Sequence, residues 1–272
     1  ARDALRREEV YAVIQVPPNI TDPDEDNATF VFYVDGSLTP FTEASKAIRN
    51  VMAFYLQRFL PADVSVERVV IGTSNTLSEY LVPIFLMAIT MLFAFTYVPY
   101  NLARESDVLE RLLVEASLEE VIVTKIGYFT ALMCLPILSF AATAWYLDYG
   151  VTLLSPSVVG VFLLTFVYLT AISMSIMILT DFSTVGRFVN VAALFAVLTF
   201  SSLVYPVGFF SPLRQEIARL MPLHYSMIMA RSLSMKDVSV TLFTDWLLVL
   251  VGFTAATAVL LKLSIIRYER TR

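Results

Sequence analysis

Glycine, cysteine and histidine are scarce in this chain of 272 residues, which contains eight, one and one of them. The sequence has no G-x-x-x-x-G-K-[ST] loop to hold phosphates, so we expect no ATP hydrolysis on this chain. Cys134 has no second cysteine for a disulfide, and His224 has no second histidine or cysteine for a metal site. We therefore expect no catalytic residue, no metal and no cofactor on this chain, and we assign His224 a structural role.

Charged residues are also scarce. They make up 16% of the chain, whereas a soluble domain has about 25%. Hydrophobic residues make up 57%, and the mean hydropathy is +0.71, which argues against a water-soluble enzyme. The apolar residues gather in stretches of about 20, long enough to cross a hydrocarbon core of about 30 Å. We predict an α-helical, multi-pass membrane protein with five spans in this chain, at residues 81–99, 127–146, 158–179, 189–209 and 246–266.

The charges that are present divide the chain into two parts. Residues 1–79 contain seven Lys or Arg and twelve Asp or Glu, whereas residues 80–272 contain twelve of each. The net charge of −5 therefore belongs to the first part, which we interpret as a water-exposed module. An acidic module argues against nucleic acid as a partner, since binding nucleic acid requires clustered Lys and Arg.

Short β-branched and aromatic runs in residues 1–79 predict a small α/β module. Residues 10–16 and 30–34 have the composition of strands, and a turn rich in Asp, Pro and Asn separates them. Residues 41–59 have helical spacing, and residues 64–71 alternate like a third strand. About 70 residues form a thin core, so we expect the membrane domain at residues 80–272 to support this module.

Lys and Arg near the span ends indicate the orientation, because these residues concentrate on the cytoplasmic side. The loop at residues 147–157 has neither, so we place it outside, together with the N-terminal module, and we place the C-terminus in the cytoplasm. The cations that mark the cytoplasmic side are Arg104, Arg111, Lys125, Arg187, Lys262, Arg267, Arg270 and Arg272.

Two features need a further explanation under this topology. Because successive spans cross the membrane in opposite directions, residues 211–245 are predicted to lie on the outside, although they contain four cations. We assign them to short amphipathic helices at the membrane interface. The acidic module also needs a means of crossing the membrane, and the sequence opens with charged residues rather than a signal peptide. We therefore expect a further span before this chain, which makes six in the native protein.

The first cytoplasmic loop is amphipathic. Apolar residues share one face of a helix that we place at about residues 104–120, and charged residues share the other. Ser117 and Glu120 have the spacing of a capping box that starts the next helix. One interpretation is an interfacial helix that only anchors the loop at the membrane surface.

A second interpretation comes from a resemblance. The loop resembles the coupling region of ABC transporter permeases of the second exporter type (ABC-2), in which a Glu-Arg-Leu-Leu core precedes a small-residue turn, more acid and a Lys. The family commonly has Pro in that turn, and this chain does not. Two further segments are similar to the family: the outside strand-turn at residues 11–19 with residues 30–37, and the segment before the last span. The matching residues of the loop are Glu110, Arg111, Leu112, Leu113, Ala116, Ser117, Glu119, Glu120 and Lys125.

The resemblance implies a permease subunit that works as a homodimer or paired permease in membrane lipid, with ATP and Mg bound on a separate ABC ATPase subunit. It implies that the coupling helix contacts the ATPase, and that the second and fifth native spans line the transport path. The polar contacts to the ATPase are then Glu110, Arg111 and Glu115, with Leu112 and Leu113 packed in its groove. The outer gate is then Tyr205, Phe209 and Phe210, beside Pro206.

Two other classes of protein stay open. A membrane-anchored sensor or assembly protein would use the outside module to bind a partner, although five spans exceed what an anchor needs. A secondary transporter is disfavoured because the predicted spans lack interior acidic residues and a visible inverted repeat. The sequence does not specify the substrate.

Overall fold

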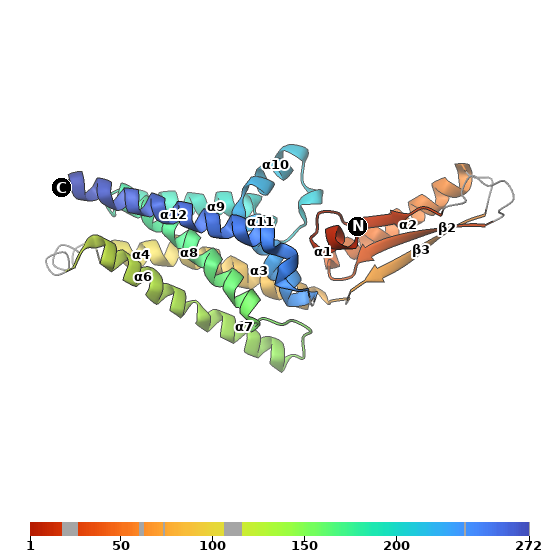
Figure 1. Ribbon diagram of the computed structural model, residues 1–272, viewed down its shortest axis with the longest axis horizontal. Helices are drawn as coiled ribbons and strands as arrows, with labels where there is room; N and C mark the ends of the chain where they lie inside the picture. The colour runs from red at the N-terminus through yellow and green to blue at the C-terminus, as the bar shows by residue number, and fades with distance from the viewer. Residues whose placement is uncertain (18–26, 60–62, 73, 106–115, 237, 272) are drawn as a thin grey trace.

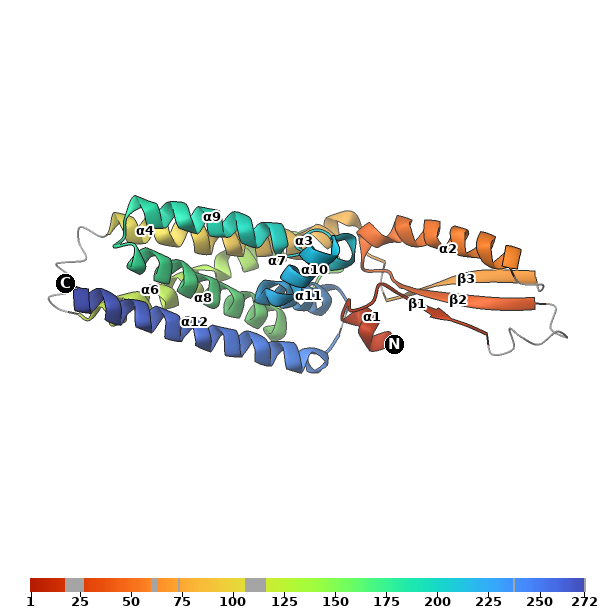
Figure 2. The ribbon, with the colours of Figure 1, turned by 90° about the horizontal axis from the view of Figure 1, so that it is seen from above.

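The computed structural model describes residues 1–272 except 18–26, 60–62, 73, 106–115, 237 and 272. The molecule is elongated: a small sheet with one helix forms one end, and a bundle of long helices forms the rest (Figure 1). The C-terminus lies at the end of the bundle farthest from the sheet, as the view from above also shows (Figure 2). The N-terminal residues lie where the sheet meets the bundle.

The N-terminal part contains the three strands and the helix that the residue patterns predict. The sheet order is β1-β2-β3, with β1 antiparallel to β2 and β2 parallel to β3, and α2 is the crossover between the parallel strands. In the register, Ala12 lies opposite Val34, and Val34 lies opposite Val70. A short helix, α1, precedes the sheet and was not predicted. The bounds are α1 Arg2–Arg6, β1 Ala12–Gln15, β2 Asn27–Asp35, α2 Thr39–Phe59 and β3 Asp63–Ile71.

The core of this part joins that of the bundle at one end only. Phe32, Val34 and Phe41 belong to the same buried cluster as the bundle helices, whereas Phe30 packs in a separate small cluster. The far end of α2 leaves large apolar side chains exposed, including Phe59. The sheet therefore depends on its contact with the bundle for most of its apolar burial.

Four helices are long and apolar enough to cross a membrane, among the residues that the structure describes. The first consists of α3, a π-helical turn η1 and α4; the second consists of α6 and α7; the others are α8 and the joined η3 and α12. These four correspond to the first, second, third and fifth predicted spans. Their bounds are Leu77–Arg104, Leu118–Tyr146, Pro156–Leu179 and Val240–Thr271, with α3 Leu77–Leu92, η1 Phe93–Tyr97, α4 Val98–Arg104, α6 Leu118–Leu132, α7 Cys134–Tyr146, η3 Val240–Phe243 and α12 Thr244–Thr271.

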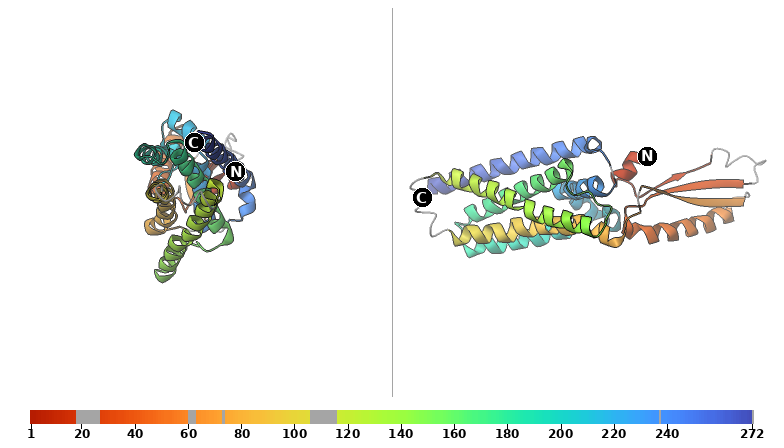
Figure 3. Two further views of the ribbon diagram at one scale, coloured as in Figure 1. Left: turned by 90° about the vertical axis from the view of Figure 1, so that its left-hand side faces the viewer. Right: turned by 90° about the horizontal axis from the view of Figure 1, so that it is seen from below.

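Helix α8 is the centre of the bundle. Nearly three quarters of its most apolar window is buried within the chain, and it contacts α3, α4, α6, α9, α11 and α12. Two of its buried hydroxyls bond to its own backbone, since Thr165 donates to the Val161 carbonyl and Ser175 donates to the Ala171 carbonyl. Seen along the long axis and from below, the other helices surround this centre, and the sheet continues the same axis (Figure 3).

The fourth predicted span has different bounds in the structure. The helix there, α9 (Thr184–Phe200), has 17 residues, and the predicted residues 201–209 are not part of it. Ser202 adopts a left-handed backbone (φ 49°), and Pro206 has no N–H to continue a helix. At 1.5 Å a residue, α9 is about 26 Å long, which is less than the hydrocarbon core of about 30 Å.

The segment predicted to lie at the membrane interface divides into two helices with opposite environments. Helix α10 (Pro212–Leu220) is largely exposed, as expected for an interfacial helix. Helix α11 (Pro222–Met235) is buried along nearly its whole length, between α3, α8 and α12. The prediction of an interfacial helix is therefore wrong for α11, because tertiary packing covers all of its faces.

Candidate functional site at the junction of the sheet and the helices

The predicted coupling residues Glu110, Arg111, Leu112, Leu113 and Glu115 lie outside the described residues. Their role therefore stays a prediction.

The two ends of that loop are described. The predicted capping box is present, since Ser117 Oγ accepts from the Glu120 N–H at 3.2 Å and the Glu120 carboxylate accepts from the Ser117 N–H at 2.9 Å. Glu105 at the end of α4 pairs with Lys125 on α6. Lys262 on α12, one of the cations that mark the predicted cytoplasmic side, pairs with Glu119. Ion pairs thus connect α4, α6 and α12 at the end of the bundle that holds this loop.

The predicted gate residues lie at the opposite end of the bundle, between α9 and α10. The rings of Tyr205 and Phe209 are 6.4 Å apart and both are exposed, while Phe210 lies under the Arg214 guanidinium at 3.8 Å. Phe209 also contacts Phe41 of α2, with ring centroids 6.3 Å apart. The structure thus brings Tyr205 and Phe209 into one aromatic group that touches the N-terminal module, whereas Phe210 packs against Arg214.

A buried group of charges lies beside this aromatic group. Arg231 of α11 pairs with Glu8 through two nitrogens, and its side chain is 1% exposed. Lys236 reaches Glu8 at 3.1 Å and Asp35 at 2.8 Å. The Arg231 guanidinium also donates to the Tyr80 hydroxyl of α3 at 2.7 Å. We call Glu8, Asp35, Tyr80, Arg231 and Lys236 the junction cluster, since it joins the N-terminal segment and the sheet to α3 and α11.

The backbone at the end of α1 turns Glu8 inward. Glu8 adopts a left-handed conformation (φ 57°), and the N–H groups of Glu8 and Glu9 donate to the carbonyls of Leu5 and Ala4. A left-handed non-glycine residue costs on the order of 1–2 kcal/mol. The ion pairs of the junction cluster offset this cost.

The charges of the junction cluster set the ionisation of its members. Burial alone would raise the pKa of Glu8, but the Arg231 and Lys236 charges outweigh burial and hold that pKa below its ordinary value. Burial alone would lower the pKa of Arg231, but the Glu8 carboxylate raises it. Both groups are therefore ionised at neutral pH, and the buried pair is a salt bridge rather than a neutral hydrogen bond.

A second set of contacts holds the N-terminal segment against α12. The Arg7 guanidinium pairs with Asp245 at 2.5 Å and with Glu9 at 3.1 Å, and it lies over the Trp246 ring at 4.6 Å. These contacts are more exposed than the junction cluster, because the Asp245 side chain is 60% exposed.

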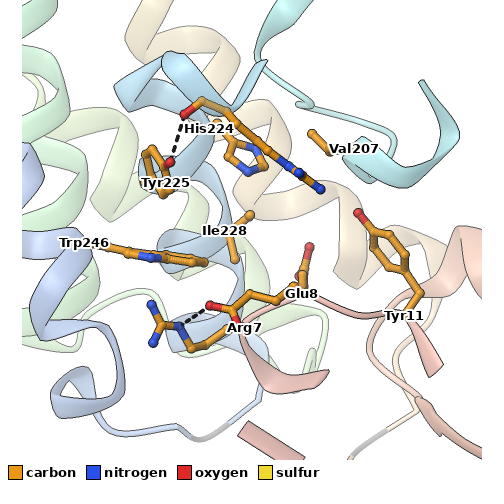
Figure 4. A pocket seen from close by; sticks show the side chains of 10 residues that line it. Arg7, Glu8, Tyr11, Val207, His224, Tyr225, Ile228 and Trp246 are labelled. Carbon is orange, nitrogen blue, oxygen red and sulfur yellow. Dashed lines mark hydrogen bonds and ion pairs between the residues drawn. The ribbon is translucent and has the colours of Figure 1, made fainter. Parts of the chain in front are cut away.

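A cavity of about 370 Å³ lies between this segment and helices α10, α11 and α12. Arg7, Glu8 and Tyr11 line one side, and Tyr225, Ile228 and Trp246 line the other, with their side chains converging (Figure 4). We call it the junction cavity.

His224 also lines the junction cavity, and it is 7% exposed. Its Nδ1 is 2.7 Å from Ser202 Oγ, and Ser202 itself donates to the Ser201 carbonyl at 2.7 Å. Burial lowers the pKa of His224 to about 4, so the ring is neutral at pH 7. The buried, hydrogen-bonded ring agrees with the structural role predicted for it.

Sequence reasoning missed the junction cluster, since it treated Arg231 as a surface cation and did not single out Glu8. One local signal was present: Arg231 lies in an apolar and small-residue stretch, and no acidic residue lies within five positions of it in the sequence. An arginine in such a setting is buried only when a distant carboxylate pairs with it.

Comparison with known proteins agrees with the resemblance noted in the sequence. A family model described as an ABC-2 family transporter protein matches residues 1–262. No curated protein matches the chain, and no solved structure matches it.

Proposed function

Because the chain belongs to the ABC-2 family of transporter proteins, we propose that it is the membrane-spanning permease subunit of an ATP-driven exporter. The observation that carries this proposal is the family match, which extends from the N-terminal module to the last helix. The ATPase activity, with its ATP and Mg, belongs to a separate partner subunit. The substrate stays open.

The partner ATPase binds the loop between α4 and α6 in this proposal. Glu110, Arg111 and Glu115 make polar contacts with it, and Leu112 and Leu113 pack in its groove. The ion pairs of Glu105 with Lys125 and of Glu119 with Lys262 support this role, because they connect the ends of the loop to three helices. A push on the loop then moves the helices together.

The chain crosses the membrane five times in this proposal, with α9 as the fourth span. Figure 2 supports this, since α9 runs back along the bundle from the end near the C-terminus to the end near the sheet, where α10 follows. The sheet and the C-terminus lie at opposite ends, which agrees with a module outside and a C-terminus in the cytoplasm.

Two copies of the permease form the transport path, lined by α3 and α9, and the gate residues close its outer end. ATP binding draws the two ATPases together and tilts the bundles so that the path opens outward. Contact of Phe209 with Phe41 supports a link between the gate and the module.

Purification from mild detergent tests the coupling. The wild-type chain is expected to co-purify with an ATPase, and the double variant Glu110→Ala, Arg111→Ala is expected to lose it. The matched control is Glu43→Ala, Lys46→Ala, which removes an exposed acid-base pair on α2 at the other end of the molecule. An ATPase that is absent from the wild-type preparation would instead favour a membrane-anchored sensor or assembly protein.

A crosslinking experiment tests the gate and the pairing of copies. Cys134 is the one cysteine, so Cys134→Ser leaves a cysteine-free chain. Phe209→Cys in that background is expected to form a disulfide between two copies. Trp145→Cys is the control, because Trp145 is an even more exposed aromatic residue (85%, against 49% for Phe209) at the same end of the bundle, on α7. Equal crosslinking of both variants would contradict a gate at Phe209.

A further inference from the structure

Some polar groups that line the junction cavity already have an ion-pair or hydrogen-bond partner, and others do not. Both of its carboxylates are already paired, Glu8 with Arg231 and Lys236, and Glu9 with Arg7. An ammonium group would therefore find no free carboxylate here. Three of the groups that remain open are a cation, a hydroxyl and a neutral ring nitrogen.

The open cation is Arg219, in the last turn of α10. Its side chain lines the junction cavity, and no carboxylate of the described residues lies within ion-pair distance of it. Its backbone carbonyl accepts the Tyr225 hydroxyl at 2.8 Å, which ties the end of α10 to α11 beside the cavity. An unpaired guanidinium at a cavity favours an oxyanion, and phosphate fits its fork of donors.

The open hydroxyl is Tyr11. Its oxygen accepts the Gly208 N–H at 2.8 Å, and its own proton has no acceptor within the described part of the chain. Burial raises the pKa of Tyr11, so the proton stays in place at neutral pH. Figure 4 shows the ring pointing across the junction cavity. Tyr11 is thus a second donor for a ligand oxygen.

The open ring nitrogen is His224 Nε2. Since the Ser202 proton is donated to the Ser201 carbonyl, the hydrogen bond to Nδ1 requires that Nδ1 carries the ring proton. Nε2 of the neutral ring is then an acceptor, and no described residue donates to it. A ligand that satisfies it must supply a hydrogen-bond donor.

We propose that the junction cavity binds a phosphodiester that carries a free hydroxyl, the headgroup chemistry of a polyol phospholipid such as phosphatidylglycerol. The phosphate oxygens accept from Arg219 and Tyr11, and the hydroxyl donates to His224. Tyr225 and Trp246 beside the start of the last long helix are residue types that concentrate at the headgroup level. A soluble glycerophosphodiester has the same chemistry. This proposal does not depend on the assignment of the chain as an exporter subunit.

Retention of lipids by the purified protein in a neutral detergent tests the proposal. Native mass spectrometry is expected to show bound phosphatidylglycerol in preference to phosphatidylcholine, which has the phosphodiester without a hydroxyl donor. Glycerophosphoglycerol, added at the same concentration, distinguishes a lipid ligand from a soluble one. If this compound displaces the lipid, the site binds a free phosphodiester. If it does not displace the lipid, the site binds the lipid itself.

Arg219→Gln is expected to weaken binding of the phosphodiester about tenfold, the effect of one charge-assisted hydrogen bond. Arg214→Gln is the control, because it removes the same charge from the same helix at a residue that contacts Phe210 and Thr199 instead of the cavity. Tyr11→Phe is expected to weaken binding less than Arg219→Gln. Equal retention of both lipids by the wild type, or equal loss with Arg219→Gln and Arg214→Gln, would overturn the proposal.

Discussion

Helices α10 and α11 are neighbours in the chain, and each begins with a proline at its first position and carries arginine. Their environments are nevertheless opposite. Arg219 on α10 is exposed, whereas Arg231 on α11 is among the most deeply buried side chains of the described residues. Helical spacing and charge therefore do not predict which arginine is buried. Burial depends on an ion-pair partner that comes from elsewhere in the chain.

For Arg231 that partner is Glu8, which is 223 positions away in the sequence. Moving one unpaired charge out of water costs several kcal/mol, so α11 tolerates its arginine only where the N-terminal segment folds over it. Helix α10 has no such cover, and its cations stay at the surface or, as for Arg214, over the face of an aromatic ring.

The strongest test of this comparison removes one arginine from each helix. Arg231→Met leaves Glu8 buried with only Lys236 beside it, and we expect a loss of about 3–5 kcal/mol in stability. Arg214→Met should cost less than about 1 kcal/mol. Thermal unfolding in detergent measures both. The double variant Glu8→Leu, Arg231→Met should recover most of the loss, since it removes both charges; equal effects of the two single variants would contradict the comparison.

The next test uses pH at the same junction. The pKa of His224 falls from 6.5 to about 4 on folding, so the unfolded chain binds the proton first as pH decreases. Stability is then complete above pH 6.5 and declines between pH 6.5 and 4, by up to about 3 kcal/mol. Loss of the Glu8 charge, whose pKa lies below 4.5, adds only at lower pH.

His224→Gln should flatten the decline between pH 6.5 and 4, as measured by melting temperature across that range. Other charged groups near the ring are Glu8, Arg219 and Arg231. Because the pKa of Glu8 is held below 4.5 and the arginines do not titrate in this window, a slope above pH 4.5 that persists in His224→Gln would assign the effect to another group.

A smaller effect is expected from a substitution at the tight contact between the N-terminal module and the segment that holds the gate residues. A Cβ on Gly208 would overlap the Tyr11 ring, whose hydroxyl accepts the Gly208 N–H. Gly208→Ala should therefore displace Tyr11 and cost about 1–3 kcal/mol. Gly252→Ala on α12, where nothing lies near the added carbon, is the control and should not destabilise the protein. Thermal unfolding of the two variants decides this prediction.

The smallest effect is expected at the exposed ion pair. Asp245→Asn removes the partner of Arg7 while Glu9 and the Trp246 ring remain. We expect a change below about 1 kcal/mol, because water screens a pair whose acidic side chain is mostly exposed. A loss as large as that of Arg231→Met would show that the outer pair, rather than the junction cluster, holds the N-terminal segment.

Local rules of the chain predicted much of the fold. Short β-branched and aromatic runs predicted β1 and β2, and alternation predicted β3. Helical spacing predicted α2, and the Ser117 and Glu120 pair predicted the start of α6. The span at residues 189–209 was less well predicted, because hydropathy does not register the left-handed Ser202 that follows the end of α9. The residues predicted to couple to the ATPase lie outside the described residues, and that prediction stays open.

Hydropathy, charge balance and local motifs, which depend only on neighbouring residues, were enough to predict a membrane protein of the ABC-2 type with an acidic module. The tertiary structure alone decided which charges are buried, and it brought Glu8 to Arg231 and Tyr11 to Gly208. The physical reason is that burial of a charge depends on its partner, and a partner across more than two hundred residues leaves no periodic signal in the chain.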